Sequence, residues 1–245
     1  MARKKKEVTS MELITQEVTT PLGNVSVVLK EGNGYNDRIL LKKNKRLHQV
    51  LPEYLNSLVA SIDGEPIKLD AVMNLLVPDY EFLLVEAYKV NYGTELEFMN
   101  VCSSCGQLNK HSIDVSELPM LPLPEDIVSG PDPYVDIVLP RTKRRARVGF
   151  LTVKSDMILN EQMAAGGAVD LNQGDFLSLR TLEGCDTVTY EAVIKLPLMD
   201  HKAIRKARRS LKAGYDPLVS LVCESCQNYD VTNILGLRDF LFPSG

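Results

Sequence analysis

The sequence predicts an α+β fold built as a tandem duplication, in which each copy is a strand-helix-helix-β-hairpin unit carrying a C-x-x-C zinc knuckle. Three observations predict it. Residues 67–105 align with residues 188–226 without a gap, at a shift of 121 positions and with nine identities. Short β-branched runs alternate with longer runs that have helical apolar spacing. Four of the five cysteines form two C-x-x-C pairs, one in each aligned segment.

Composition sets the limits for this interpretation. The chain has 245 residues, of which 44% are hydrophobic, enough for two domains of ordinary size. Its net charge of -4 argues against a protein whose main role is to coat nucleic acid. No run approaches the roughly 18 apolar residues of a membrane span, so no contact with a membrane is expected.

The identities between the two segments fall at helix caps, turns and candidate metal ligands. Composition alone would give roughly two or three matches over such a stretch. We therefore predict a flexible basic tail at 1–16, a first repeat at 17–118, an extended proline-rich linker at 119–134, and a second repeat with a C-terminal docking tail at 135–245. The identical pairs are Ala71/Ala192, Val72/Val193, Leu75/Leu196, Asp79/Asp200, Gly93/Gly214, Val101/Val222, Cys102/Cys223, Ser104/Ser225 and Cys105/Cys226.

Each copy is expected to begin with a strand, at 25–29 and at 135–139, where apolar residues alternate. Helical spacing then predicts a helix at 46–62 in the first copy and helices at 155–165 and 175–182 in the second.

A short helix at 69–76 is expected to precede a longer helix that starts at Asp79, a good N-cap residue, and runs to residue 91, with Gly93 as its left-handed C-cap. Its counterpart runs from Asp200 to residue 213 and is closed by Gly214. Each of these helices should lead into a hairpin with the knuckle at its tip. The hairpin strands are expected at 95–101 with 108–115, and at 218–222 with 229–234.

The two knuckles are the main candidate site. A C-x-x-C turn presents two thiolates to one metal ion, and tetrahedral zinc needs two more ligands. The other copy can supply them, so we expect Cys102, Cys105, Cys223 and Cys226 to share one structural Zn²⁺ across a pseudo-twofold interface.

Other uses of the cysteines stay open at this stage. His111 could complete a site with the first knuckle, but its counterpart in the second copy is Thr232. Thiols without metal are a second alternative and a redox pair a third, although a thioredoxin-like pair belongs at a helix start and these lie between two strands. Cys185 is interpreted as a buried or inert thiol.

No catalytic constellation stands out, so we expect no enzyme. The sequence has three histidines, each in helix or hairpin patterning, and contains neither a glycine-rich phosphate loop nor a nucleophile elbow.

Two basic clusters are expected at the periphery. Residues 141–147 should decorate a strand or hairpin, with a solvated edge strand as the simplest alternative. The helix from His201 offers Arg205, Arg208 and Arg209 either as a solvated face or for contacts with an acidic partner. Phe240 and Phe242 near the C-terminus suggest docking against a neighbour, although packing in the chain's own core explains them as well.

Several short motifs resemble the T-even-type phage baseplate hub and tail assembly protein family of contractile-tailed phages. They are Ser61-Ile-Asp-Gly64, Leu75–Asp79 opening a helix, Tyr92-Gly93, Val101-Cys-Ser-Ser-Cys-Gly106, Leu196-Pro-Leu-Met-Asp200 and Val222-Cys-Glu-Ser-Cys226. The resemblance implies a structural or assembly component at the baseplate or tail hub. Such a protein would contact other tail and baseplate proteins, in several copies and in a symmetric assembly. It would reside in the virion tail, and in the host cytoplasm during assembly.

The alternative function is a zinc-ribbon nucleic-acid-binding protein. Zinc ribbons often serve that role, but neither basic cluster is interleaved with the aromatic side chains on which bases stack. Nucleic acid is therefore not the expected partner.

Overall fold

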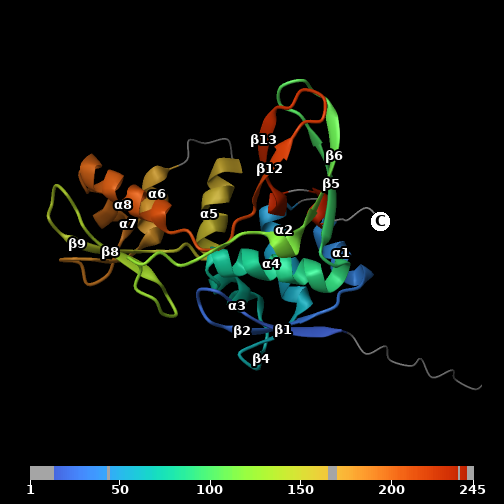
Figure 1. Ribbon diagram of the computed structural model, residues 1–245. Coiled ribbons are helices and arrows are strands. Elements are labelled where there is room, and N and C mark those ends of the chain that lie inside the picture. Colours follow the sequence, from blue (N-terminus) through green and yellow to red (C-terminus); the bar gives the residue numbers. More distant parts are fainter. Residues whose placement is uncertain (1–13, 43–44, 165–169, 237, 242–245) are drawn as a thin grey trace, which may run out of the picture.

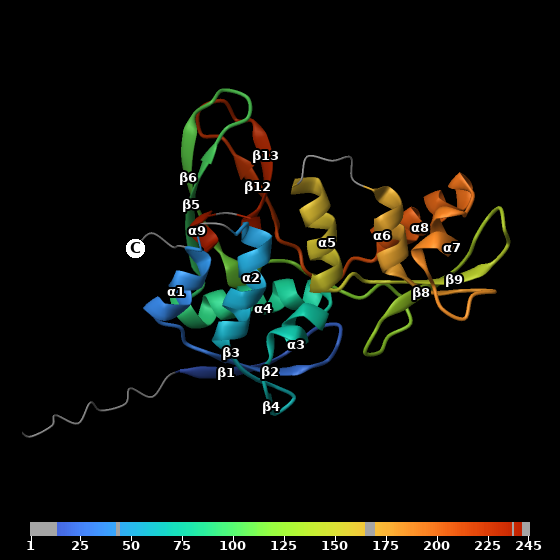
Figure 2. The same ribbon diagram turned by 180° about the vertical axis from the view of Figure 1, so that it is seen from behind.

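The chain forms two bodies of mixed helix and sheet, with a pair of β-hairpins beside the larger body (Figure 1). The computed structural model describes residues 14–42, 45–164, 170–236 and 238–241, and only the backbone of 238 and 239. The predicted α+β class is confirmed. Figure 2 shows the same arrangement from behind, with the smaller body beyond helix α5. Among the described helices, none is both long and apolar enough to cross a lipid bilayer.

The larger body contains an antiparallel sheet of order β1-β2-β3-β4 and four helices. Its core lies where helices α2 and α4 meet the sheet, with Val27, Leu55 and Leu83 fully buried. The strands are β1 (Thr15–Thr19), β2 (Ser26–Lys30), β3 (Val59–Ile62) and β4 (Glu65–Pro66). The helices are α1 (Gly34–Leu40), α2 (Leu47–Leu58), α3 (Leu69–Asn74) and α4 (Val77–Tyr92).

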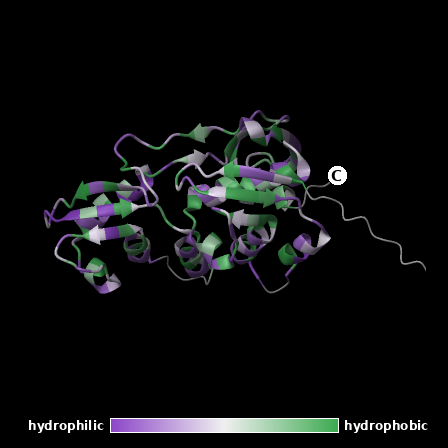
Figure 3. Cartoon of the chain, turned by 90° about the horizontal axis from the view of Figure 1, so that it is seen from below, coloured by the Kyte–Doolittle hydropathy of each residue, from purple (hydrophilic) through white to green (hydrophobic). Residues whose placement is uncertain are grey.

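The smaller body contains an antiparallel sheet of order β10-β9-β8 and a core around Val148, Leu182 and Ile204. Green and purple segments alternate along the strands of this smaller sheet in Figure 3, as expected when one face is buried. The strands are β8 (Tyr134–Val138), β9 (Arg145–Gly149) and β10 (Leu179–Leu182). Its helices are α6 (Leu171–Ser178), α7 (Tyr190–Ile194) and α8 (Leu198–Ser210), whereas α5 (Val153–Ala164) stands between the two bodies (Figure 2) and buries Val153 in the larger core.

The two hairpins stand side by side and their tips meet (Figures 1 and 2). The first hairpin pairs β5 (Glu95–Val101) with β6 (Leu108–Asp114), and the second pairs β12 (Leu218–Val222) with β13 (Tyr229–Asn233). Their positions agree with the sequence prediction to within one residue. Short 3-10 turns follow them at Val115–Glu117 and Ile234–Gly236, and α9 (Arg238–Leu241) ends the described chain.

The second hairpin and α9 pack on the larger body, although they follow the smaller body in sequence. Leu221, Ile234, Phe240 and Leu241 are all buried in the larger core. A two-stranded pairing of β7 (Met120–Leu121) with β11 (Gly214–Tyr215) lies where the chain returns. The predicted boundary near residue 134 therefore separates the two halves of the sequence but not the two cores.

Two predicted helices are too long at their C-terminal ends. Helix 46–62 stops at Leu58 and helix 175–182 stops at Ser178, and in both places the last four residues form a strand of the adjoining sheet. The apolar spacing continues across each junction, so periodicity alone did not mark it. Pairing of β3 with β2 and of β10 with β9 decides the conformation.

The aspartates expected as helix caps hold turns instead. Leu76 and Pro197 are the N-cap residues of α4 and α8, so the predicted N-cap role of Asp79 is wrong. The buried carboxylate of Asp79 accepts the backbone N–H groups of Leu22 and Gly23, both at 2.8 Å, in the turn between β1 and β2.

Asp200 makes the same connection in the smaller body. It accepts the backbone N–H groups of Arg141 at 2.7 Å and Thr142 at 3.1 Å, in the turn between β8 and β9. Both aspartates therefore tie a hairpin turn to the first turn of a helix. Gly93 has φ 85° and ends α4 as predicted, whereas α8 stops at Ser210, so Gly214, with φ 82°, begins β11 and does not cap the helix.

In the remaining segments the structure agrees only in part with the prediction. The proline-rich stretch 119–134 is free of helix and contains β7, and its Ile127 is buried against the two bodies in a small cluster with Leu76 and Phe150. β9 pairs on both sides, so the solvated-edge interpretation of residues 141–147 is wrong. Residues 1–13 of the predicted tail lie outside the described residues, and β1 begins at Thr15.

Candidate metal centre

Each C-x-x-C sequence closes the tip of its hairpin in the same way. In the first tip, the N–H of Cys102 donates to the carbonyl of Gln107 at 2.9 Å, and the N–H of Gly106 donates to the carbonyl of Cys102 at 3.0 Å. The second tip repeats both bonds at 2.9 Å, with residues 121 positions further along. Gly106 and its counterpart Gln227 both have a left-handed backbone, with φ 72° and 59°. This tight turn brings the two sulfurs of a knuckle to one side.

The four sulfurs of the two knuckles form one group. The Sγ atoms of Cys102 and Cys226 are 3.6 Å apart, as are those of Cys105 and Cys223. All four ligand atoms lie within 4.8 Å of one another. Tetrahedral zinc with Zn–S bonds of about 2.3 Å places its sulfurs about 3.8 Å apart. The predicted grouping is therefore confirmed: these four cysteines can hold one metal ion between them.

Burial follows the position of each cysteine in its knuckle. The first cysteine of each pair is buried, with 2% of Cys102 and 3% of Cys223 exposed, whereas Cys105 and Cys226 are exposed. An ion at the centre would be shielded by protein on one side and reached by solvent past the second pair.

Hydrogen bonds around the sulfurs run reciprocally between the hairpins. The N–H of Ser103 donates to Asp230 Oδ2 at 3.1 Å, and the N–H of Glu224 donates to Asn109 Oδ1 at 3.2 Å. Donors and acceptors are each 121 positions apart in the sequence. Such an exchange is the pattern of a self-complementary twofold interface. These contacts orient the two tips toward each other independently of any ion.

Each thiol strongly affects the pKa of the others, because four neighbouring sulfurs cannot all carry negative charge without a cation. Backbone N–H groups of Cys226 and Ser225 lower the pKa of Cys223 to about 6, against the effect of burial. At Cys105 the backbone N–H of Gln107 also lowers the pKa, but hydrogen bonds with the neighbouring thiols and partial loss of hydration outweigh it and raise the pKa to about 12. The donor set therefore favours a bound cation.

The geometry supports neither His111 nor Cys185 as a further metal ligand. His111 lies in β6 with its ring 5.5 Å from that of Phe98, and it is not part of the cysteine group among the described residues. Cys185 lies half-buried in the smaller body, where its Sγ accepts a hydrogen bond from Arg144 Nη2 at 3.2 Å.

The arginines predicted for partner contacts divide into two kinds. Arg205 Nε donates to Asp175 Oδ2 at 3.0 Å, and Arg208 Nη1 lies 3.8 Å from Asp175 Oδ1. Asp175 is fully buried and also bonds His201 Nδ1 at 2.7 Å. Arg205 and Arg208 therefore join α8 to α6 within the chain, whereas Arg209 is exposed.

Of the two phenylalanines near the C-terminus, the structure describes the surroundings of Phe240 only. Phe240 is buried and stacks on Tyr88 with ring centroids 4.9 Å apart, so packing in the chain's own core, the alternative left open above, is what the structure shows. Phe242 lies outside the described residues.

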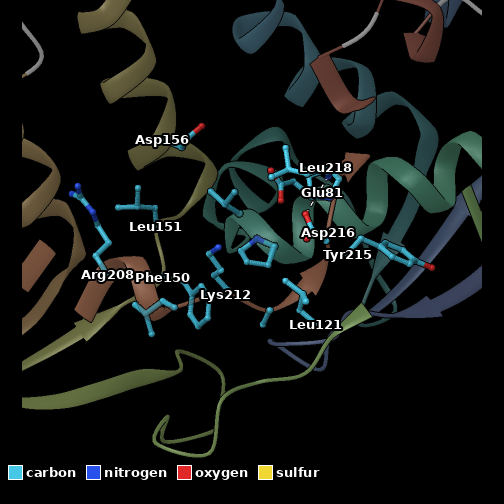
Figure 4. A pocket seen from close by; sticks show the side chains of 15 residues that line it. Glu81, Leu121, Phe150, Leu151, Asp156, Arg208, Lys212, Tyr215, Asp216 and Leu218 are labelled. Carbon is cyan, nitrogen blue, oxygen red and sulfur yellow. Dashed lines mark hydrogen bonds between the residues drawn. The ribbon is translucent and has the colours of Figure 1, made fainter. Parts of the chain in front are cut away.

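A cavity of about 350 Å³ lies between the two bodies (Figure 4). Its lining includes Glu81 and Asp216 on one side and Phe150 and Arg208 on the other. Burial, together with the negative charges of Asp156 and Asp216, raises the pKa of Glu81 to about 7. The ionised carboxylate is thus unfavourable in the folded chain.

We expect this carboxyl to make stability depend on pH. Because the folded pKa lies above the unfolded one, the folded chain holds the extra proton, and stability is lost as the pH rises from about 4.5 to about 7. Replacing Glu81→Gln should remove on the order of 2 kcal/mol of that loss. Urea unfolding at pH 5 and pH 8 measures the difference, with the exposed Glu65→Gln as control. Equal pH dependence in wild type and Glu81→Gln would contradict it.

Comparisons of the chain with protein-family models, curated proteins and solved structures find no match. The resemblance to the phage baseplate family therefore stays a prediction from sequence motifs.

Proposed function

We propose that the chain is a non-enzymatic structural or assembly component of a contractile phage tail, at the baseplate or tail hub, in which one zinc ion staples the two halves together. The observation that carries the stapling is the convergence of four sulfurs, two from each half, within 4.8 Å. Four thiolates in tetrahedral array suit zinc among the common metals.

A structural role for the ion follows from its ligands. Four protein ligands complete the tetrahedron, so no position remains open for water or substrate. The site then contributes stability and rigidity to the pair of hairpins, and acts through the protein surface that it holds in place.

We further propose that the two halves are a tandem duplication. Four features support it: the same succession of hairpin, helices and knuckle, the paired burial of the cysteines, the reciprocal bonds of Ser103 and Glu224, and the turns held by Asp79 and Asp200. The pseudo-twofold axis would pass through the metal centre.

The assignment to a phage tail rests on the sequence motifs. Two of them, Val101–Gly106 and Val222–Cys226, form the knuckle tips, and two others contain the turn-holding residues Asp79 and Asp200. The motifs thus lie at positions that organise the fold. The proposed partners are other tail and baseplate proteins, met first in the host cytoplasm and retained in the virion tail.

Two measurements test the proposal. Elemental analysis of the purified chain should give one zinc per chain. Mass spectrometry of purified contractile-tailed particles from the source phage should find this polypeptide in the tail fraction. Its absence both from particles and from tail-assembly intermediates would overturn the phage role, and retention on DNA that weakens steeply with salt would favour the nucleic-acid-binding alternative.

A further inference from the structure

The two ends of the molecule carry opposite charge. Residues 135–213, which comprise α5 and the smaller body, contain 14 Lys and Arg against nine Asp and Glu, whereas residues 14–134 contain nine against 17. The net charges are therefore +5 and -8 by the formal count. The overall value of -4 conceals this polarity, which is the charge distribution that allows one copy to attract the opposite end of another.

Helix α8 presents a basic and apolar face to solvent. Leu198 and Met199, with 83% and 57% of their surface exposed, lie at its first turn, and the exposed Lys202, Lys206 and Arg209 follow. At 3.6 residues per turn these five side chains lie within about 100° of one another around the axis. Among the described residues no carboxylate lies within ion-pair distance of the three cationic ones. We call these five residues the α8 face.

The first hairpin presents the opposite pattern on its outer side. Its base carries the paired Glu95 and Asp114, with Glu97 next, and its tip carries the paired Val101 and Leu108, with 59% and 53% of their surface exposed. Lys110 also lies on this side and pairs with Glu97 at 2.7 Å in an exposed ion pair. The remaining charge is acidic. We call this surface the β5 face.

The two faces match in length as well as in order. The α8 face spans about 16 Å from its apolar to its basic end at 1.5 Å per residue, and β5 spans about 20 Å from its acidic to its apolar end at about 3.4 Å per residue. The apolar end of the α8 face can therefore meet the apolar end of the β5 face, while the basic end of the first meets the acidic end of the second. In Figures 1 and 2 the β5 hairpin and α8 lie at opposite sides of the molecule, so one chain cannot join its own two faces.

We propose that the α8 face of one copy binds the β5 face of a second copy, so that the chain associates head to tail. Such a heterologous contact generates a closed ring or an open filament, according to the rotation between successive copies. The exposed apolar residues at the start of α8 favour a protein surface over nucleic acid as the occupant. For its biological setting the inference rests on the structural role proposed above.

Sedimentation velocity over a concentration series tests the contact on the full zinc-loaded chain. Wild type should form oligomers at about 50 mM salt and dissociate toward monomer at about 500 mM, where exposed charges are screened. Lys202→Glu with Lys206→Glu should weaken association at least tenfold, as should Glu95→Lys with Glu97→Lys. Lys68→Glu with Lys154→Glu changes the net charge as the α8 variant does, but away from both faces, and should leave association intact. Unchanged zinc content and melting temperature will show that each variant is folded.

A mixture of the two charge-reversed variants gives the decisive test. The two reversed variants, each monomeric alone, should associate when combined because every α8 face then meets a complementary β5 face. A wild type that stays monomeric at every concentration, or a mixture that stays monomeric, overturns the proposal. So does loss of association on changing α8 but not β5, accompanied by DNA binding. The zinc and particle measurements are unaffected by these outcomes, so the proposed function can survive failure of the head-to-tail contact.

Discussion

Replacing Cys102→Ser should abolish binding of the proposed zinc ion and destabilise the whole chain, and Cys223→Ser should do the same. Each change removes one buried sulfur from a group in which all four lie within 4.8 Å, so neither knuckle can retain the ion alone. Zinc held by thiolates contributes on the order of 10 kcal/mol to folding, comparable with the net stability of a domain. Elemental analysis and thermal unfolding measure both effects.

The control for this experiment is Cys185→Ser, which removes a half-buried thiol in the smaller body and should leave the metal content unchanged. Chelation of wild type should reproduce the loss of stability seen in the two variants. Two ions per chain, or one ion that survives both single replacements, would contradict a shared centre. A metal lost from Cys102→Ser but kept by Cys223→Ser would show that the first knuckle binds with other ligands.

Removing the carboxylate of Asp200 should lower the free energy of unfolding by about 3 to 6 kcal/mol. Asp200→Ala leaves the N–H groups of Arg141 and Thr142 without their acceptor, and hydrogen bonds to a charged group contribute about 1.5 to 3 kcal/mol each. Asp200→Asn keeps one acceptor oxygen and should cost about half as much. Chemical denaturation measures the loss, and hydrogen exchange should locate it in the β8–β9 turn.

Asp79→Ala provides the matched experiment in the larger body, where the amides of Leu22 and Gly23 should lose protection by a similar amount. The exposed Asp186→Ala serves as control and should change stability little. A loss near 1 kcal/mol confined to the first turn of α4 would instead indicate that Asp79 acts as a helix cap.

Local patterns predicted local structure well in this chain. The bounds of β5 and β12 follow from alternation and the C-x-x-C turns, and the grouping of the cysteines follows from their equivalence between the two halves. The sequence prediction extended helix α2 four residues too far, because Val59 and Ile62 continue the apolar spacing of the helix although they pair in the sheet. Strand pairing depends on residues about 30 positions away, which a local window does not include.

Tertiary placement was the part that sequence patterns could not supply. Alternation marks Leu221 as a buried side chain but does not say which core receives it, and it lies in the larger one. Arg205 and Arg208 looked like a free basic face because their partner Asp175 lies about 30 residues upstream on another helix. The sequence gives the sign of each charged side chain. Whether that side chain faces inward depends on whether its partner is buried.

The return of the second hairpin to the larger body has a consequence for the order of folding during synthesis. Leu221, Ile234, Phe240 and Leu241 complete a core whose other members begin at Val27, so the first body cannot be finished before the segment 221–241 has been made. Contacts across so much of the chain raise the contact order and slow folding. The smaller body draws its core from residues 135–211 and can assemble earlier. The segment 221–241 thus closes a body whose other residues are mostly made before the smaller body.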